Sequence, residues 1–320
     1  MSLESHAEVM KLARLLGTTP QRLDYLGRLD PADTRALRER ANDVFHEDDR
    51  RLGRVALAAR IPPAPVTAWI AQHLFGPLLC ARIAGLLDTR RAVDLAKRMP
   101  PEFLADLAMH LDPRRAREII FELPPALIGK VADVLNQRDE HIAMGRFVGH
   151  MTDASLRECF AVIDDSTLLR ISYFVEEKQH LDHVVGLLDI DRVRNAIREA
   201  SDEDLWPQAL DLLTRVSPER AGALADLAAD EDDDVLGGMV FAAQRDGLWD
   251  VVLPITLHMS DEGLERFAQL PALHEPDVIV AIIDAAYDEE LLQDLLPLAA
   301  YMPDDARQAI ADHAPNLLDR

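Results

Sequence analysis

The residues of this 320-residue chain best suited to metal chemistry form a short run of carboxylates and imidazoles, EEKQHLDH, which begins at Glu176. Glu177 and His180 have the Glu-x-x-His spacing that di-iron helical bundles use, and His183 lies about one helical turn beyond His180. A di-iron site needs two such pairs and two further carboxylates, and the sequence has no second Glu-x-x-His. Glu177, His180 and His183 are therefore candidate metal ligands in a segment whose pattern favours a polar helix face.

A second set of candidate ligands is the acidic run DEDDD, which begins at Asp230. Carboxylates such as Asp230, Asp232 and Asp234 can gather a loose Mg²⁺ or Ca²⁺ site. The run lacks the Asp-x-Asp-x-Asp-Gly loop of a dedicated calcium site and falls where a helix start is expected. The favoured interpretation is a solvated helix N-terminus, where acidic residues complement the helix dipole. We expect no cofactor, with weak Mg²⁺ binding as the alternative.

The apolar segment from Val66 to Leu87 holds the third set of candidates, Trp69, His73 and Cys80. Its length equals that of a membrane span, roughly 20 residues, but Arg82 in its second half is costly in a bilayer. Gly76 and Pro77 interrupt the segment, so we predict two short buried helices and no stable membrane insertion. The alternative is that Trp69, His73 and Cys80 lie beside a pocket for an apolar small molecule.

Composition and charge limit the classes of partner. Hydrophobic residues make up 48% of the chain, which is enough for a core, whereas few residues are aromatic, which disfavours an all-β fold. The net charge of −23 disfavours nucleic acid, because such binding requires cations that neutralise phosphates. Two cysteines and no signal-peptide pattern favour a reducing, cytoplasmic location.

Charge is divided unevenly along the chain. Residues 1–130 carry a net charge of +3 and residues 131–320 carry −26. This division favours a protein partner with a basic surface, or a contact between the two oppositely charged parts, and leaves a homo-oligomer open.

The chain is predicted to have three segments. Residues 1–60 form a helical head, with helix starts at Asp30-Pro31 and near residues 46–49, and residues 61–67 form a stiff connection rich in proline. Residues 68–320 contain neither long strand-like alternation nor hairpin dipeptides, and they are predicted to form one helical repeat array.

Internal repeats are the strongest signal in the sequence. Windows of similar sequence start at Leu205, Leu248 and Leu291, a constant period of 43 residues. The aligned columns are Trp206, Trp249 and Leu292; Leu210, Leu253 and Leu296; and Ser217, Ser260 and Pro303. We assign the recurring Trp206 and Trp249 to packing, and we expect the column of Leu210, Leu253 and Leu296 to be buried in successive repeats. An apolar residue ends one helix in each window, and Ser, Pro or an acid starts the next.

Similar helix-start motifs occur upstream at Met99, Leu111, Leu123, Met151, Ile163 and Ala200. Their spacing implies helices of only about eight to eleven residues, which are stable only when stacked on neighbours. We therefore predict an all-α fold, a right-handed α-solenoid of short helices that is HEAT- or armadillo-like.

The stretch from Met99 to Leu135, MPPEFLADLAMHLDPRRAREIIFELPPALIGKVADVL, resembles the cytoplasmic N-terminal domain of MgtE-type magnesium transporters. That domain is a superhelix of short helices that open with LPPE or LDPE. The resemblance covers about 37 residues and implies the fold. The chain lacks the pattern of transmembrane helices, so transport is not implied, although a response to Mg²⁺ is.

The sequence therefore favours a non-catalytic helical-repeat protein that acts as a protein-interaction or regulatory scaffold. No phosphate-binding loop, nucleophile elbow or zinc motif occurs in it. Two alternatives remain: a regulatory protein that responds to divalent cations such as Mg²⁺, and an enzyme or carrier for an apolar small molecule.

Overall fold

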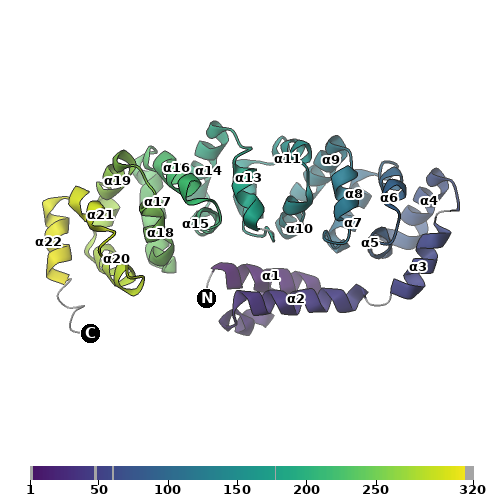
Figure 1. Ribbon diagram of the computed structural model, residues 1–320, viewed down its shortest axis with the longest axis horizontal. Coiled ribbons are helices and arrows are strands. Elements are labelled where there is room, and N and C mark those ends of the chain that lie inside the picture. Colours follow the sequence, from purple (N-terminus) through teal and green to yellow (C-terminus); the bar gives the residue numbers. More distant parts are fainter. Residues whose placement is uncertain (1–2, 47–48, 60, 177, 314–320) are drawn as a thin grey trace. The chain divides into compact units, whose positions relative to one another are not determined.

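The computed structural model describes residues 3–46, 49–59, 61–176 and 178–313, and every regular element in these ranges is a helix (Figure 1). Helix accounts for 76% of the structure, and the described residues form 22 α-helices and no strand. The predicted all-α class is confirmed. None of the described helices is long and apolar enough to cross a membrane.

The chain divides into two compact units, which we describe separately. Unit 1 is Met1–Thr167 with Phe174–Lys178, and unit 2 is Leu168–Tyr173 with Gln179–Arg320. The proline-rich residues 61–67 lie inside unit 1, where helix α4 (Ala64–Ile70) already begins at Ala64. Pro65 occupies the first turn of α4, where a missing amide leaves no hydrogen bond unmade.

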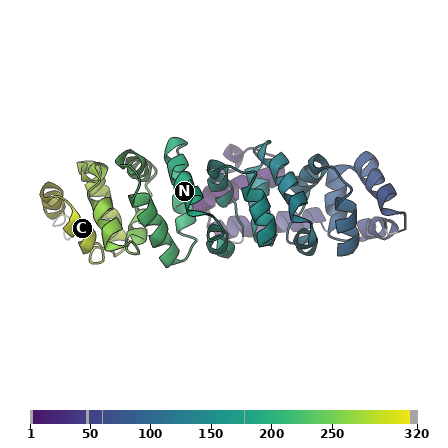
Figure 2. The ribbon, with the colours of Figure 1, turned by 90° about the horizontal axis from the view of Figure 1, so that it is seen from above.

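Unit 1 opens with two helices joined by a 3-10 segment: α1 (Leu3–Leu16), η1 (Pro20–Arg28) and α2 (Pro31–His46). We call these three elements together the hairpin, although η1 returns the chain so that α1 and α2 run in the same direction. It lies alongside the row of helices from α5 to α10 in both views (Figures 1 and 2). The helices after the hairpin are α3 (Asp49–Ala58), α4, η2 (Ala71–Phe75), α5 (Gly76–Ala84), α6 (Thr89–Ala96), α7 (Pro101–His110), α8 (Arg117–Glu122), α9 (Pro125–Asn136), α10 (His141–Phe147), η3 (Val148–His150) and α11 (Asp153–Phe160). Helix α12 (Asp165–Ser172) begins in unit 1.

Short helices in unit 1 bury their apolar faces against other helices near them in the sequence. Successive odd-numbered helices from α3 to α11 pack on one another, as do successive even-numbered helices from α4 to α8. Leu111, Ala116 and Ile120 form one buried cluster, on which Phe147 and Met151 also pack. Because none of these helices exceeds 12 residues, their stability comes from this packing rather than from helix propensity.

Unit 2 repeats every 43 residues, with three helices in each repeat. The equivalent starts are Ile190, Asp233 and Pro276 for the first helix of each repeat, and Pro218, Asp261 and Asp304 for the third. After η4 (Lys178–His180) and α13 (Leu181–Val185), the helices are α14 (Ile190–Asp202), α15 (Trp206–Leu213), α16 (Pro218–Ala229), α17 (Asp233–Asp246), α18 (Trp249–Thr256), α19 (Asp261–Ala268), η5 (Pro271–His274), α20 (Pro276–Asp288), α21 (Leu296–Tyr301) and α22 (Asp304–His313).

The last repeat departs from the predicted columns. Trp206 and Trp249 are buried, as are Leu210 and Leu253, which confirms their assignment to packing. The corresponding Leu296 is 64% exposed, so the prediction that this column is buried throughout is wrong for the last repeat. The second helix starts at Trp206 and Trp249 in the first two repeats but only at Leu296 in the third, so the last repeat differs in local structure at this column.

The predicted helix starts are confirmed at Pro101, Pro125, Asp153 and Asp165, within a residue or two of each motif. Two motifs behave differently. After Leu111 a turn delays α8 to Arg117, because the Asp112 carboxylate accepts a hydrogen bond from the Arg114 amide (3.1 Å) and stabilises the turn. The residues after Ala200 start no helix, since α14 continues to Asp202.

The apolar segment 66–87 forms two helices that meet at Gly76, as predicted. The prediction that both helices are buried is wrong, because several of their large side chains are exposed. Gly76 has a φ of +74° and separates η2 from α5. Trp69 is 55% exposed and Leu74 68% exposed. The two helices bury Ala64, Ala68 and Ala81 instead, because small side chains allow close helix packing.

Candidate interaction site

Two of the three predicted metal ligands near residue 180 lie within the described residues. Glu177 lies outside the described residues, whereas His180 ends the 3-10 segment η4 and His183 lies in α13. Within the described ranges, no three His, Cys, Asp or Glu side chains are close enough together to hold a metal ion.

The acidic run at residue 230 lies at the start of α17, as its pattern predicts. Asp230 forms ion pairs with Arg194 (3.2 Å) and with Arg266. Asp232 is the residue before the first turn of α17, and Asp234 lies in that turn. The Asp230 carboxylate is therefore engaged by two guanidinium groups from neighbouring helices.

Trp69, His73 and Cys80 lie on consecutive elements of unit 1. The Trp69 and His73 rings stack with centroids 4.9 Å apart, and both side chains are exposed. The Cys80 thiol donates to the Ala71 carbonyl oxygen (3.5 Å), and burial raises its pKa to about 11. A thiol with so high a pKa is a poor nucleophile at neutral pH.

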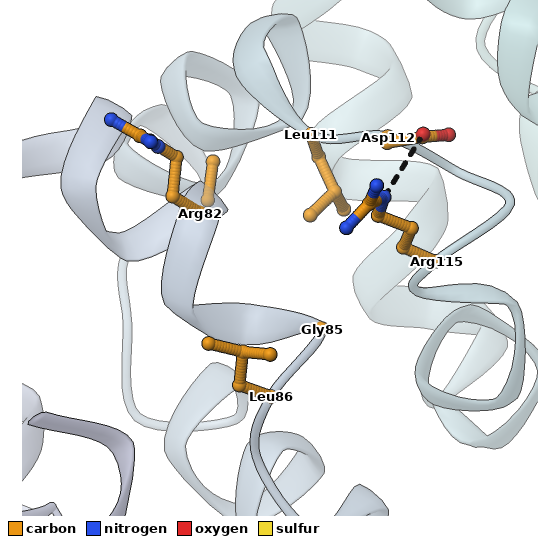
Figure 3. Close-up of a pocket in the computed structure, with 7 residues that line it drawn as sticks. Arg82, Gly85, Leu86, Leu111, Asp112 and Arg115 are labelled. Atoms are coloured by element: carbon orange, nitrogen blue, oxygen red, sulfur yellow. Dashed lines mark ion pairs between the residues drawn. The ribbon is translucent and has the colours of Figure 1, made fainter. Parts of the chain in front are cut away.

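A small open cavity of about 190 Å³ lies between α5 and the turn that precedes α8 (Figure 3). Its lining includes Arg82, Leu111, Asp112 and Arg115, and none of the three predicted pocket residues. Arg115 and Asp112, both from the turn that precedes α8, form an ion pair on one side of it (3.7 Å). This volume is below the usual range for a small-molecule site, roughly 300–1,000 Å³.

The most developed polar arrangement lies where the hairpin meets the other helices of unit 1. We call it the hairpin site. It comprises Glu4, Glu8, Lys11, Arg14, Arg35, Arg38, Glu39, Asn42 and Asp43 of the hairpin, and Asp112, Arg114, Arg115, Glu140, Arg146 and Glu176 of the segments that face it.

Glu8 lies at the centre of the hairpin's own part of this site. Its carboxylate is 1% exposed and contacts the Lys11 ammonium (2.9 Å) and the Arg38 guanidinium (3.1 Å). Burial acts to raise the pKa of Glu8, but the charges of Lys11, Arg38 and Arg35 outweigh it and lower that pKa. Burial lowers the pKa of Lys11, against the opposing charge of Glu8.

Arg38 connects this buried pair to the rest of unit 1. Its Nη1 atom lies 2.8 Å from a carboxylate oxygen of Glu176, and the Arg146 Nε atom approaches the same oxygen (3.4 Å). Burial is the main cause that lowers the pKa of Arg146. Glu176 therefore lies between two buried guanidinium groups, one from α2 and one from α10.

Two further contacts join the hairpin to the segments that face it. The Asn42 amide donates to the buried Asp112 carboxylate (2.8 Å), and Arg14 donates to Glu140 (2.5 Å). Burial acts to raise the pKa of Asp112, but hydrogen bonds from Arg114 outweigh it and lower that pKa. The hairpin thus contacts these segments through charged and amide groups.

The chemistry of the site favours specificity over strength. Burying a charge costs free energy, and a buried pair recovers that cost only when its geometry and hydrogen bonds are good. Removing one partner leaves an unpaired buried charge, which is strongly destabilising. The hairpin site can therefore hold one defined arrangement of helices, and it can discriminate between partners by charge.

The hairpin site could not be predicted from spacing in the sequence, because its partners are far apart along the chain. Arg14 and Glu140 are separated by 126 residues, and Arg38 and Glu176 by 138. One local signal was present: Glu8 and Lys11 interrupt the apolar face of α1 formed by Val9 and Leu12. Charges on the buried face of an amphipathic helix indicate a partner of opposite charge.

A comparison of this chain with protein-family models, curated proteins and solved structures finds no match.

Proposed function

We propose that this chain is a non-catalytic α-solenoid, a right-handed superhelix of short helices, that acts as a protein-interaction or regulatory scaffold. The regular 43-residue spacing of helix starts in unit 2 supports the repeat architecture, since HEAT and armadillo repeats have similar periods. The helix starts at Pro101 and Pro125 support the proposed likeness to the N-terminal domain of MgtE-type transporters.

The observation that carries the proposal is the hairpin site. A pair of helices lies against the helix row of unit 1, and its cations Arg14 and Arg38 contact the carboxylates of Glu140 and Glu176. We take this intramolecular contact as a model for how a partner protein would bind. A protein that presents basic side chains on a helix would find the same carboxylates, and residues 131–320 carry a net charge of −26 to attract it.

The test begins with capture of partners from the source lysate on the full chain, followed by kinetics with the purified partner. We expect the association rate to fall as salt is added, because charge steers the encounter, while dissociation changes less. Glu140→Lys should weaken binding. The matched control is Glu122→Lys, on the exposed end of α8, which should bind like the unmodified chain.

Two results would contradict the proposal. One is an association rate that does not change with salt, and the other is a Glu140→Lys variant that binds the purified partner as well as the control. Hydrogen exchange adds a further check: a partner that binds Glu140 and Glu176 must displace the hairpin and so expose the amides of α1 and α2 to solvent.

A further inference from the structure

Outside the hairpin site, two segments of opposite net charge each expose large apolar side chains. Residues 50–98 contain nine Lys or Arg and two Asp or Glu, a net charge of +7 in a chain whose total is −23. Residues 276–313 contain nine Asp or Glu and one Arg, a net charge of −8. Each segment also exposes large apolar side chains.

The first face lies on α3, α4, η2 and α5 of unit 1, together with Ile61 between α3 and α4. We call it the cationic face. It exposes Leu57, Ile61, Val66, Trp69, Leu74, Phe75 and Leu78, each by at least 40%. Val66, Trp69 and His73 follow one another at helical spacing, so they line one side of α4 and η2. The exposed Arg54 and Arg90 belong to the same stretch of chain.

The second face lies on α20, α21 and the turn between them, in the last repeat of unit 2. We call it the anionic face. It exposes Tyr287, Leu292 and Leu296 among the exposed carboxylates Asp288, Glu289, Glu290 and Asp294. Helix α21 packs on α19, and α22 packs on α20.

In the earlier repeats, helices cover the apolar positions that are equivalent to those of the anionic face. At the column of Leu292, Trp206 and Trp249 are buried, and at the column of Leu296, Leu210 and Leu253 are buried. In those repeats the next repeat supplies packing partners: α15 packs on α17, and α18 packs on α20. In the last repeat the equivalent Leu292 and Leu296 are 42% and 64% exposed.

Large exposed apolar patches mark surfaces that contact another protein. Here both faces are apolar, and their charges decide how they can pair. Two cationic faces repel each other, as do two anionic faces, whereas one of each kind attracts. The chemistry therefore favours a second copy of this chain that brings its anionic face to the cationic face of the first.

We propose that this protein self-associates head to tail, with α20–α21 of one copy packed on α3–α5 of the next. The proposal goes beyond the proposed scaffold function and needs no other partner. The contact uses two different surfaces, so each copy keeps one free face and can bind a further copy. Such heterologous interfaces build open assemblies, or rings where the rotation closes.

The first experiment is sedimentation velocity on the full chain from about 1 to 200 μM at low and physiological salt. We expect the average mass to rise beyond that of a dimer with concentration, and to fall as salt screens the opposing charges. A chain that stays monomeric throughout would overturn the proposal.

The decisive experiment mixes two variants that each lack one face. Leu74→Glu places a negative charge in the cationic face, and Leu296→Arg places a positive charge in the anionic face. Both side chains are more than 60% exposed, so both variants should fold. Each alone should associate at least tenfold more weakly, whereas a mixture should form one-to-one dimers through the two intact faces and stop there.

A matched control is Phe241→Glu in α17, which changes a side chain that is 63% exposed and lies on neither face. It should associate like the unmodified chain. Two results would overturn the proposal: variants that still associate alone, or a monomeric chain whose Leu74 is instead required for binding to vesicles of phosphatidylcholine with phosphatidylserine. The second result would assign the cationic face to an anionic membrane surface.

Discussion

Three residues with left-handed backbone conformation recur at the repeat period. Asp204, Gly247 and Glu290 have φ values of +53°, +67° and +59°, and they are 43 residues apart. Each follows the first helix of its repeat. Glycine adopts this conformation without the steric cost that a side chain adds, so the middle repeat has the most favourable residue of the three.

Gly247 and Gly237 offer a matched test of this backbone effect. A Cβ atom would meet nothing within 4 Å at either position, so only backbone conformation distinguishes them. Gly247→Ala should lower the free energy of unfolding by about 1 kcal/mol, because alanine would have to adopt a positive φ, which its side chain disfavours. Gly237→Ala, inside α17, should raise it by roughly 0.5–1 kcal/mol. Chemical denaturation measures both, and equal effects would contradict the assignment.

A carboxylate from the preceding repeat anchors the start of α16 and of α19. Asp182 accepts hydrogen bonds from the Ser217 amide and hydroxyl, both at 2.8 Å, and Asp226 accepts from the Ser260 amide (3.0 Å). Ser260 also caps its own helix, as its column predicts, whereas the hydroxyl of Ser217 donates to Asp182 instead. These contacts connect adjacent repeats at their turns.

Asp182 should make stability depend on pH in acid. Hydrogen bonds from Ser217 and Arg220 lower its pKa to about 2. Its stabilising contribution is therefore complete above the unfolded-state pKa of about 3.9 and is lost as the pH falls through about 2. Asp182→Asn should cost roughly 1 kcal/mol at pH 7, a modest value because the side chain is partly exposed. The difference from the unmodified chain should shrink between pH 5 and pH 2 in urea titrations.

At the scale of helices, the hairpin is the element whose attachment depends most on charge. Arg38→Met would leave Glu8 without its Arg38 contact and Glu176 with Arg146 alone. Breaking a buried pair costs about 3 kcal/mol or more, which is roughly a hundredfold in an opening equilibrium. Amides of α1 and α2 should lose protection from hydrogen exchange, while those of α7 and α9 keep theirs. Arg40→Met, at an exposed position of α2, should leave exchange unchanged.

The sequence predicted helices well because their starts are local. Proline or serine at a helix start, as at Pro101 and Pro218, depends on a few neighbouring residues, and the 43-residue period follows from repetition of that local pattern. The hairpin site could not be predicted in the same way, since the pairing of Arg38 with Glu176 depends on the packing of segments 138 residues apart. The exposure of Trp69 was missed because apolar content alone does not distinguish a buried helix from an uncovered one.

The repeat columns yield a prediction about packing with its own control. Leu253 is fully buried in α18, and Leu296 occupies the same column but is 64% exposed. Leu253→Ala should lower the free energy of unfolding by about 2–5 kcal/mol, because it leaves a cavity. Leu296→Ala, measured below the concentrations at which copies associate, should change it by about 0.5 kcal/mol at most. Equal costs would show that the column alignment does not describe the packing.

For the whole molecule, the distribution of charge along the chain indicates more about its partners than the net charge does. Residues 131–320 carry −26, and in unit 2 many of their carboxylates pair with arginines of neighbouring helices. Glu231, for example, contacts both Arg194 (3.1 Å) and Arg198 (2.7 Å). Such pairs contribute little to stability individually, and the excess of acidic over basic residues can attract cations or basic surfaces.

Divalent cations should bind this acidic part weakly and without a defined site. Asp230, which begins the densest acidic run, already pairs with Arg194 and Arg266, so a cation would have to compete with two guanidinium groups. Tight Ca²⁺ or Mg²⁺ binding requires several oxygens held at fixed geometry around one ion. Calorimetric titration with Mg²⁺ and with Ca²⁺ at physiological ionic strength should therefore show no saturable site of micromolar affinity.

A single stoichiometric site would contradict this prediction, and it would favour a cation-responsive regulator over an interaction scaffold. Asp230→Asn distinguishes the two cases, because loss of the site in that variant would assign it to the start of α17.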